Sequence, residues 1–545
     1  MFKFKKLTIG LILGFLILPL ISFAWSQNET LFINSDYDLS GRNQIEVQLL
    51  KTTNKIYFYA DKNWYQNFSQ KADLDSKLYT LASDFEYKIY PFLTNLLGSE
   101  DNPGVDNEPR IVIVLEPLKD NYGGYIQSGD EYLKAQYKNS NEGQIIYLNS
   151  NLIIKADLNF LDYELAHEFT HLITLKQKPE AETWFYELMS EFAGQAIGVD
   201  TSQITKQRAQ ALLYSTEANL KDWINSDKDY AKVFLFALYL KEQFGNQVFA
   251  EALKYPSKDG LTSFNEALKK RGANFDEVYL NWLIANLYNT CETNNLKYYY
   301  QNPVLKNYSI VAYSYYLPIQ AKSLLSVTDS IKLLTGKWQK LNGGLGTTKF
   351  KFTIPEQTPI SKIPYLIEDN QGKKTLGFFD FSSSNIQEVY INDLGTKNTA
   401  IYFIPYLGSL AQENKLYFYS FEAQNLGDNV QDEQAAIKTL QQRIEELKRQ
   451  VASLQLQLAM LKTNQNNTTC SVFSSDLYYG MNSNQVKCLQ QFLANLGSEI
   501  YPEKLITGYY GPLTMAAVKR YQILKGIITT GYFGPLTRAA VNQGI

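Results

Sequence analysis

The sequence is poor in histidine and cysteine and has no excess of charge of either sign. Two His occur among 545 residues, which excludes a three-His zinc site and any chemistry that needs several separate His. The 52 Lys and Arg nearly balance the 55 Asp and Glu, and no basic stripe interrupts the chain, so no nucleic-acid partner is expected. Hydrophobic residues at 45% and charged residues at 20% are typical of globular domains, which excludes wholesale disorder and a multi-span membrane protein.

The first 24 residues have the pattern of a secretory signal. Lys3, Lys5 and Lys6 precede an apolar run that ends at Ala24 with small residues at the positions read by signal peptidase. An uncleaved membrane anchor is the alternative, because this run is at the lower limit of what spans a bilayer. We expect an exported protein, either secreted or associated with the cell envelope.

The three cysteines fit an exported chain. Cys470 and Cys488 lie close together in a small C-terminal region and are expected to form a disulfide, with two buried thiols as the alternative. Cys291 is expected to be a thiol in the core.

The chain length predicts three or four domains. Residues 31–149 mix short β-rich runs with a helical stretch over residues 71–97, and residues 161–288 are almost entirely helical in spacing. This order predicts a two-lobed α+β domain over residues 25–290. Residues 298–427 carry short β-branched and aromatic runs separated by turns, which predicts an all-β, sandwich-like domain, either a spacer or a carbohydrate- or protein-binding part.

A heptad seam follows within residues 432–463. Apolar residues alternate at spacings of three and four, at Ile437, Leu440, Ile444, Leu447, Val451, Leu454, Leu458 and Leu461. This pattern predicts a coiled coil and self-association through it. Packing of the stripe on a neighbouring domain is the alternative.

The last region, residues 464–545, contains an internal repeat. Residues 506–518, ITGYYGPLTMAAV, are echoed by residues 529–541, TTGYFGPLTRAAV. These residues resemble the peptidoglycan-binding repeat family, a small three-helix module. The resemblance implies peptidoglycan as a partner. A dimerisation or substrate-docking role is the alternative.

Both histidines lie in one motif, His167-Glu-x-x-His171, on a predicted helix. The His residues are one turn apart on the same face, where two imidazoles can bind one Zn²⁺, and Glu168 is placed to reach a water on the metal as general base. A hydrolytic zinc site needs a third protein ligand, and that ligand cannot be His.

Downstream, Glu187-x-x-Ser-Glu191 follows Trp184 on a second predicted helix, and this pattern resembles the gluzincin metallopeptidases, including thermolysin. The resemblance implies that Glu187 is the third zinc ligand and that Glu191 orients the first His. The spacing between His171 and Glu187 is a few residues shorter than in those groups. Glu182 and Glu180 are the alternative ligands.

The same resemblance implies two further parts of the site. Tyr230 resembles the Tyr that stands near the oxyanion in several gluzincin groups, and Gly123-Gly124-Tyr125 is the candidate sheet edge that binds extended peptide. An ordinary turn and hairpin is the alternative for this segment. The surrounding residues are also similar to hyicolysin-type bacterial peptidases.

Together these features predict a multidomain protein with a zincin-like peptidase domain, a β-sandwich-like domain, a coiled coil and a peptidoglycan-binding domain. The expected activity is that of an exported zinc-dependent endopeptidase acting on proteins or peptides. The alternatives are a catalytically silent adhesion or scaffold protein and a peptidase for peptidoglycan stem peptides.

Overall fold

The computed structural model describes residues 25–120, 122–290, 295–356, 358–409, 413, 415–426, 441, 444, 445, 447–449, 451 and 472–543. They belong to two compact units, one within residues 1–439 and one within residues 440–545. The predicted signal peptide, Cys291, Cys470 and most of the predicted coiled coil lie outside the described residues, so these expectations stay predictions. No described helix is both long and apolar enough to cross a membrane.

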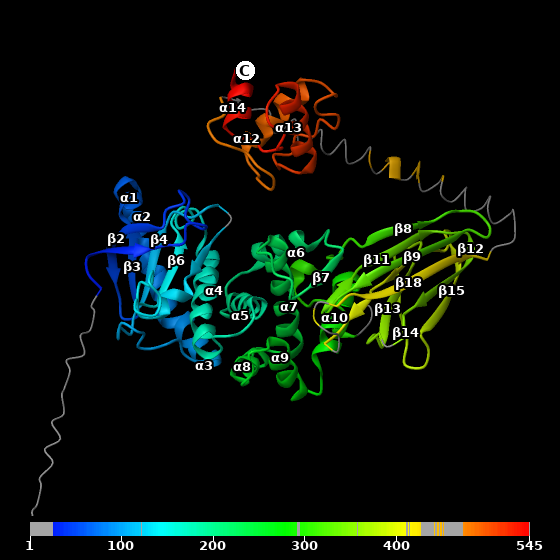
Figure 1. The fold of residues 1–545 in the computed structure, drawn as a ribbon, viewed down its shortest axis with the longest axis horizontal. Coiled ribbons are helices and arrows are strands. Elements are labelled where there is room, and N and C mark those ends of the chain that lie inside the picture. Colours follow the sequence, from blue (N-terminus) through cyan, green and yellow to red (C-terminus); the bar gives the residue numbers. More distant parts are fainter. Residues whose placement is uncertain are drawn as a thin grey trace, which may run out of the picture. The chain divides into compact units, whose positions relative to one another are not determined.

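The first unit begins with a six-stranded mixed sheet in the order β1-β2-β3-β4-β6-β5 (Figure 1). Its strands are β1 (Asn28–Phe32), β2 (Gln44–Thr52), β3 (Ile56–Asp61), β4 (Ile111–Glu116), β5 (Gly124–Ile126) and β6 (Ile145–Asn149). Side chains alternate between the faces, since Ile56 and Phe58 join the core shared with the helices while Tyr57 and Tyr59 pack on the opposite face. β3, β4 and β6 are parallel, and β5 is the antiparallel strand at one edge.

Helices follow β3, and the last two of them lie within the predicted helical stretch over residues 71–97. They are α1 (Lys62–Asn67), α2 (Lys71–Asp84) and α3 (Tyr90–Leu97), and a π-helical turn over Phe85–Ile89 joins α2 to α3. Leu74, Leu78 and Leu81 recur at helical spacing and are buried in the core.

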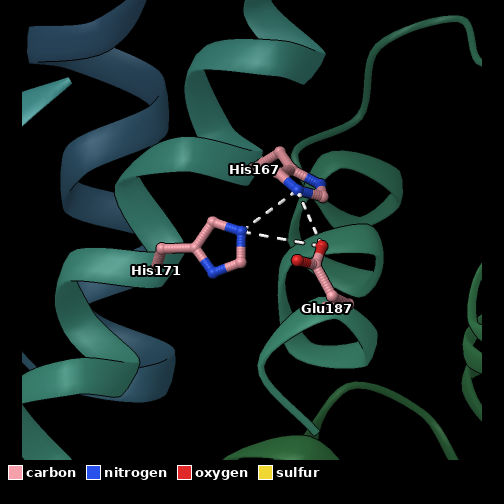
Figure 2. A group of neighbouring side chains, drawn as sticks. All are labelled: His167, His171 and Glu187. Atoms are coloured by element: carbon pink, nitrogen blue, oxygen red, sulfur yellow. Dashed lines mark hydrogen bonds and ion pairs between the residues drawn. The ribbon is translucent and has the colours of Figure 1, made fainter. Parts of the chain in front are cut away.

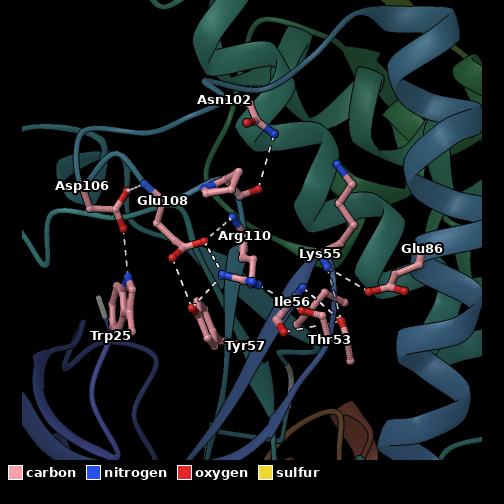
Figure 3. A network of polar contacts seen from close by, with 11 residues as sticks. Trp25, Thr53, Lys55, Ile56, Tyr57, Glu86, Asn102, Asp106, Glu108 and Arg110 are labelled. Carbon is pink, nitrogen blue, oxygen red and sulfur yellow. Dashed lines mark hydrogen bonds and ion pairs between the residues drawn. The ribbon is translucent and has the colours of Figure 1, made fainter. Parts of the chain in front are cut away.

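A polar network closes the end of this sheet beside the loop before β4 (Figure 3). Arg110 donates to Glu108 over 2.7 Å and to the Tyr57 hydroxyl over 2.9 Å, and Trp25 donates to Asp106 over 2.9 Å. The acidic side chains of this loop therefore serve local hydrogen bonds.

A helical region occupies residues 158–288, as the sequence predicts. Its helices are α4 (Leu158–Gln177), α5 (Thr183–Ala196), α6 (Ser202–Leu212), α7 (Asp227–Phe244), α8 (Gln247–Lys254), α9 (Gly260–Lys269) and α10 (Phe275–Tyr288). Asp157 precedes α4, and its side chain accepts a hydrogen bond from the Phe160 backbone over 2.9 Å and caps the helix. α4 packs on α5 and on α2 and α3 beside the sheet, so it joins the two lobes.

The β-rich region differs from the expected sandwich. Nine strands form one continuously hydrogen-bonded, nearly closed barrel-like sheet instead of two separate stacked sheets. The strands of the β-rich region are β8 (Tyr313–Leu317), β9 (Leu324–Ile331), β10 (Thr335–Lys337), β11 (Gln339–Gly343), β12 (Gly346–Thr353), β13 (Lys362–Asp369), β14 (Lys374–Asp380), β15 (Ile386–Leu394), β16 (Asn398–Phe403), β17 (Tyr406–Leu407) and β18 (Tyr417–Asn425). β16 pairs with both β11 and β13, and the parallel pair of Leu394 with Asn398 joins β15 to β16 and so links the two groups of strands into one sheet.

The β-rich region is not a separate spacer. β10 pairs with β7 (Glu217–Asn219) of the helical region on one side and with β17 on the other. Trp338 is completely buried in the same core cluster as α10, and its indole N–H donates to the Leu283 carbonyl over 2.9 Å. The predicted boundary near residue 290 therefore lies inside one compact unit.

The second unit contains a small helical module with its own core. Its helices are α12 (Asn484–Asn495), α13 (Pro512–Leu524) and α14 (Pro535–Asn542). Gln490 and Gln522 occupy equivalent positions, each ahead of one of the two repeats. Each side chain is buried and hydrogen-bonds to the Gly-Tyr turn and to the Thr of the repeat that follows it. The repeat in the sequence is thus a repeat in the structure.

Candidate metal centre

Two consecutive helices bring His167, His171 and Glu187 together, and Figure 2 shows the three side chains pointing toward one another. The two His Nε2 atoms lie 3.2 Å apart, and Glu187 Oε2 lies 3.4 Å from His167 Nε2 and 3.7 Å from His171 Nε2. Ligand atoms about 2.0–2.1 Å from a tetrahedral ion lie about 3.3–3.4 Å apart. The spacing of the three atoms therefore fits one zinc ion.

The chemistry of this donor set also fits a cation. Burial lowers the pKa of His167 and of His171 to about 4, so both imidazoles are neutral near pH 7 and can offer a lone pair. Glu187 Oε2 is buried and receives no hydrogen bond within the described part of the chain. Three atoms that can each offer a lone pair to a cation thus converge on one point. Among the described residues, this is the one group of His, Cys, Asp and Glu with metal-ligand spacing.

Glu168 lies on the same helix beside this group. Its Oε2 atom is buried and has no hydrogen-bond partner among the described residues. Burial, together with the charges of Glu164, Glu187 and Glu191, raises the pKa of Glu168 well above its usual value. A positive charge in the centre would oppose this shift and favour the carboxylate form that accepts a proton.

Glu191 has different partners from the one expected. It is fully buried, accepts a hydrogen bond from the Tyr163 hydroxyl and pairs with Arg208 Nη2 over 2.8 Å. No hydrogen bond joins Glu191 to His167 within the described residues. The carboxylate is close enough to raise the pKa of His167, although burial has the larger and opposite effect. The direct polar partners of Glu191 are therefore Tyr163 and Arg208.

Tyr230 is a further predicted site residue, and the structure places it on the cavity wall. Its hydroxyl donates to Asn225 Oδ1 over 2.8 Å, and the Arg208 guanidinium lies 5.3 Å from the ring centre. Burial, followed by the charges of Glu187, Tyr37 and Glu168, raises the pKa of Tyr230, so its hydroxyl remains a hydrogen-bond donor.

The predicted edge segment lies at the sheet edge beside α4. In β5, Gly124 pairs with Leu148 and Tyr125 pairs with Tyr147. A Cβ atom on Gly124 would come within 2.8 Å of the Tyr147 carbonyl oxygen and 3.0 Å of Glu168 Cγ. Only glycine lets the strand approach the helix this closely.

A cavity of about 470 Å³ joins these parts. Its walls include the three candidate ligands, Glu168, Tyr230 and the Gly123–Gly124 segment. A ligand in this cavity would contact the metal group, the adjacent acid and the sheet edge at once.

The alternative ligands lie elsewhere. Glu182 accepts a hydrogen bond from the Trp184 indole over 3.0 Å and pairs with Lys221 over 2.8 Å. Glu180 is exposed and pairs with Lys258 over 3.4 Å. Neither carboxylate belongs to the metal group.

Three residues that line the cavity were missed by the sequence reasoning: Arg208 on α6, Glu164 on α4 and Tyr37 before β2. Burial raises the pKa of Glu164 to about 7. Because Glu164 lies one helical turn before Glu168, the sequence could have predicted that it lines the same cavity. Arg208 and Tyr37 gave no such signal, because only the tertiary fold brings α6 and the N-terminal loop to the cavity.

Comparison with known proteins identifies the C-terminal module. Residues 482–541 match the family model described as "Putative peptidoglycan binding domain". The match supports peptidoglycan as a partner and suggests an association with the cell wall. It spans the three helices α12, α13 and α14. Cys488 is buried in this module, and its pairing with Cys470 stays a prediction.

Two solved structures are distant likenesses of parts of this chain. No curated protein matches. The pre-peptidase C-terminal domain of a collagenase from Bacillus anthracis is 10% identical, with a TM-score of 0.14, over 20% of this chain and 95% of its own. PliG, a periplasmic inhibitor of g-type lysozyme from Aeromonas hydrophila, is also 10% identical, with a TM-score of 0.15, over 21% of this chain and 96% of its own. Such low scores carry no inference about activity.

Proposed function

We propose that this protein is an exported zinc-dependent endopeptidase held at the cell wall by its C-terminal module. The observation that carries the proposal is the convergence of His167, His171 and Glu187 within 3.2–3.7 Å, beside the buried acid Glu168 and in a cavity bordered by a sheet edge. The resemblance of these residues to the gluzincin peptidases points the same way.

The two imidazoles and the Glu187 carboxylate would hold the ion. When bound, Zn²⁺ supplies Lewis acidity at its open position and makes a water there acidic near neutral pH. Glu168 then accepts the proton of the attacking water on its carboxylate and passes it to the nitrogen of the leaving amine. Both transfers use the oxygen that lacks a partner in the structure.

The remaining cavity residues would position the substrate. The outer edge of β5 would offer its backbone groups to an extended peptide by strand addition, and Glu168 lies beside this strand at Gly124. The Tyr230 hydroxyl and the Arg208 guanidinium are our candidate donors for the oxyanion, since neither His remains free for that task.

Comparison of the wild type with Glu168→Gln on a casein-type substrate tests the proposal. The exchange preserves side-chain size but removes the proton acceptor, so we expect zinc binding to persist and hydrolysis to fall by a factor on the order of a hundred or more. Glu180→Gln removes the same charge at an exposed site and serves as the control. Wild type and Glu168→Gln that are equally inactive with zinc bound would support a silent scaffold instead.

Peptidoglycan stem peptides are a second candidate substrate, because the matched module would bring the catalytic unit to the wall. Incubation with purified sacculi distinguishes the two. Release of soluble muropeptides by the wild type and not by Glu168→Gln would assign stem peptides as substrates.

A further inference from the structure

Glu164 is a cavity residue to which the proposed reaction gives no task. It lies on α4, three residues before His167 and four before Glu168, so its side chain shares the cavity-facing side of the helix. No hydrogen bond or ion pair involves Glu164 among the described residues, although it is at most partly exposed. A carboxylate without a partner in a substrate cavity is available to bind a group of the ligand.

The position of Glu164 relative to the sheet edge is defined by two adjacent glycines. A Cβ atom on Gly123 would come within 2.2 Å of Glu164 Oε2, whereas a Cβ atom on Gly124 would come within 3.1 Å of Glu168 Oε1. The two acids therefore face successive residues of the segment that leads into β5. A helical turn rises about 5.4 Å, and an extended chain advances about 3.3 Å per residue, so Glu164 stands one or two substrate residues from the proton acceptor.

The charges around Glu164 favour a cation. Arg208 is the one permanently positive side chain among the described cavity-lining residues, and its Nη2 already pairs with Glu191 over 2.8 Å. Asp120 and Asp227 add negative charge to the wall. Within the described residues, Glu164, Asp120 and Asp227 form no ion pair, so these acids of the cavity wall remain open to a cation.

The adjacent walls suit a long aliphatic stem. Phe160 precedes Glu164 by one helical turn, and Ile204 and Leu152 line the same cavity. Lys and Arg side chains place their methylene groups along such surfaces and extend their charged ends to an acid.

We propose that Glu164 binds a cationic side chain, of the Lys or Arg class, one or two residues from the cleaved bond. This inference rests on the proposed peptidase function and makes Glu164 the residue that sets its specificity. A free α-amine offers the same ammonium chemistry, and the experiment separates the two sources.

The test measures kcat/KM on N-acetylated, C-amidated peptides that carry Lys or norleucine at one position near the cleaved bond. A charge-assisted hydrogen bond predicts that the wild type prefers Lys by a factor of about ten or more. In Glu164→Gln, we expect the ratio of kcat/KM for the Lys peptide to kcat/KM for the norleucine peptide to fall toward one. Glu164→Asp keeps the charge on a shorter side chain and should retain part of the preference. Glu180→Gln is the control for loss of one negative charge.

Binding to the zinc-loaded Glu168→Gln protein keeps this inference distinct from the peptidase proposal. Calorimetry with the same peptides should show tighter binding of the Lys peptide, lost in Glu164→Gln/Glu168→Gln. If the wild type hydrolyses nothing while this difference persists, the peptidase proposal fails and the cation site stands. If both the wild type and Glu164→Gln hydrolyse the peptides, and the ratio of kcat/KM for the Lys peptide to that for the norleucine peptide is the same in the two proteins, the cation site is wrong. A Glu164-dependent preference for unblocked over acetylated peptides, without a Lys preference, would overturn the side-chain assignment in favour of the α-amine.

Discussion

Glu116 shows how one buried residue supports the sheet edge. It is fully buried at the end of β4, where Oε2 accepts a hydrogen bond of 2.7 Å from the Tyr125 hydroxyl of β5. Burial raises the pKa of Glu116 to about 8. The folded protein therefore binds one more proton than the unfolded chain between about pH 4.5 and pH 8.

The sign of this difference predicts a pH-dependent stability. The folded state is favoured below this range and loses stability as the pH rises through it. Glu116→Gln cannot ionise and can still accept the hydrogen bond from Tyr125, so its melting temperature should rise relative to the wild type between pH 5 and pH 9. Thermal unfolding followed by circular dichroism at several pH values measures this, and a constant difference between the two proteins would contradict it.

At the same scale, the sequence identified the metal group but not its surroundings. His167, Glu168 and His171 follow from a local helical spacing, so they were predictable. Arg208 and Tyr163 became visible as the partners of Glu191 only in the fold, because these contacts join residues on three different helices. Specific polar partners of a buried acid depend on packing and have no local signature.

Among the elements, β5 is the one to which the proposed function assigns peptide binding. Gly124→Ala would push the strand away from the Tyr147 carbonyl and from Glu168. A displacement of about 1 Å in a catalytic site lowers rates on the order of a hundredfold, so we expect a loss of this size in kcat/KM. Ile126→Val, on the same strand, should lose far less. Equal activity of Gly124→Ala and wild type would show that peptides do not bind along β5.

Within the C-terminal module, the buried glutamines make a second prediction at this scale. The Gln490 side chain accepts from the Gly508 backbone and donates to the Tyr509 carbonyl and to Thr514, each over 2.8 Å. Gln490→Ala should cost about 1–3 kcal/mol of stability and weaken binding to purified sacculi. Gln491→Ala changes the exposed neighbour on the same helix and should leave both unaltered. The outcome that opposes this account is equal stability of the two variants.

The elements were predicted best where the residue pattern is local. The helices over residues 158–288 and the repeat over residues 506–541 follow from helical spacing and turn residues. The β-rich region was recognised as strands, but its closure into one sheet was missed. Strand order depends on pairings such as β11 with β16, which lie about sixty residues apart, and alternation within each strand is the same in a barrel and a sandwich.

At the scale of the whole molecule, the region around the candidate centre and the β-rich region share one core. Trp338, Leu366, Ile404 and Tyr406 belong to the same core cluster as the helices around the candidate centre. The sequence placed a domain boundary near residue 290 because the pattern changes there from helical to β-rich. A change of pattern does not reveal whether two regions share a core.

This shared core predicts the result of truncation. A chain of residues 25–290 lacks Trp338, which packs on α10. We expect this chain to be insoluble, or to have a melting temperature well below that of the chain of residues 25–426. Trp338→Ala in the longer chain should cost about 3–5 kcal/mol. Soluble expression and thermal unfolding of the three proteins measure this, and a stable 25–290 chain with bound zinc would mean that the β-rich region is independent after all.

Self-association through residues 432–463 also belongs to this scale and stays a prediction. Ile444, Leu447 and Val451 of the seam are described, and each is about half exposed, at 49%, 46% and 51%. Sedimentation of the full chain should show a dimer or trimer. Leu447→Glu should dissociate it, because a charge in the seam opposes packing.

The most direct test of the central claim is the zinc content of purified protein measured by mass spectrometry. We predict about one zinc ion per chain in the wild type and in the control Glu180→Ala, and a large loss of zinc in Glu187→Ala, because two imidazoles alone do not complete a tetrahedral site. Equal zinc content in Glu187→Ala and the wild type would contradict the account.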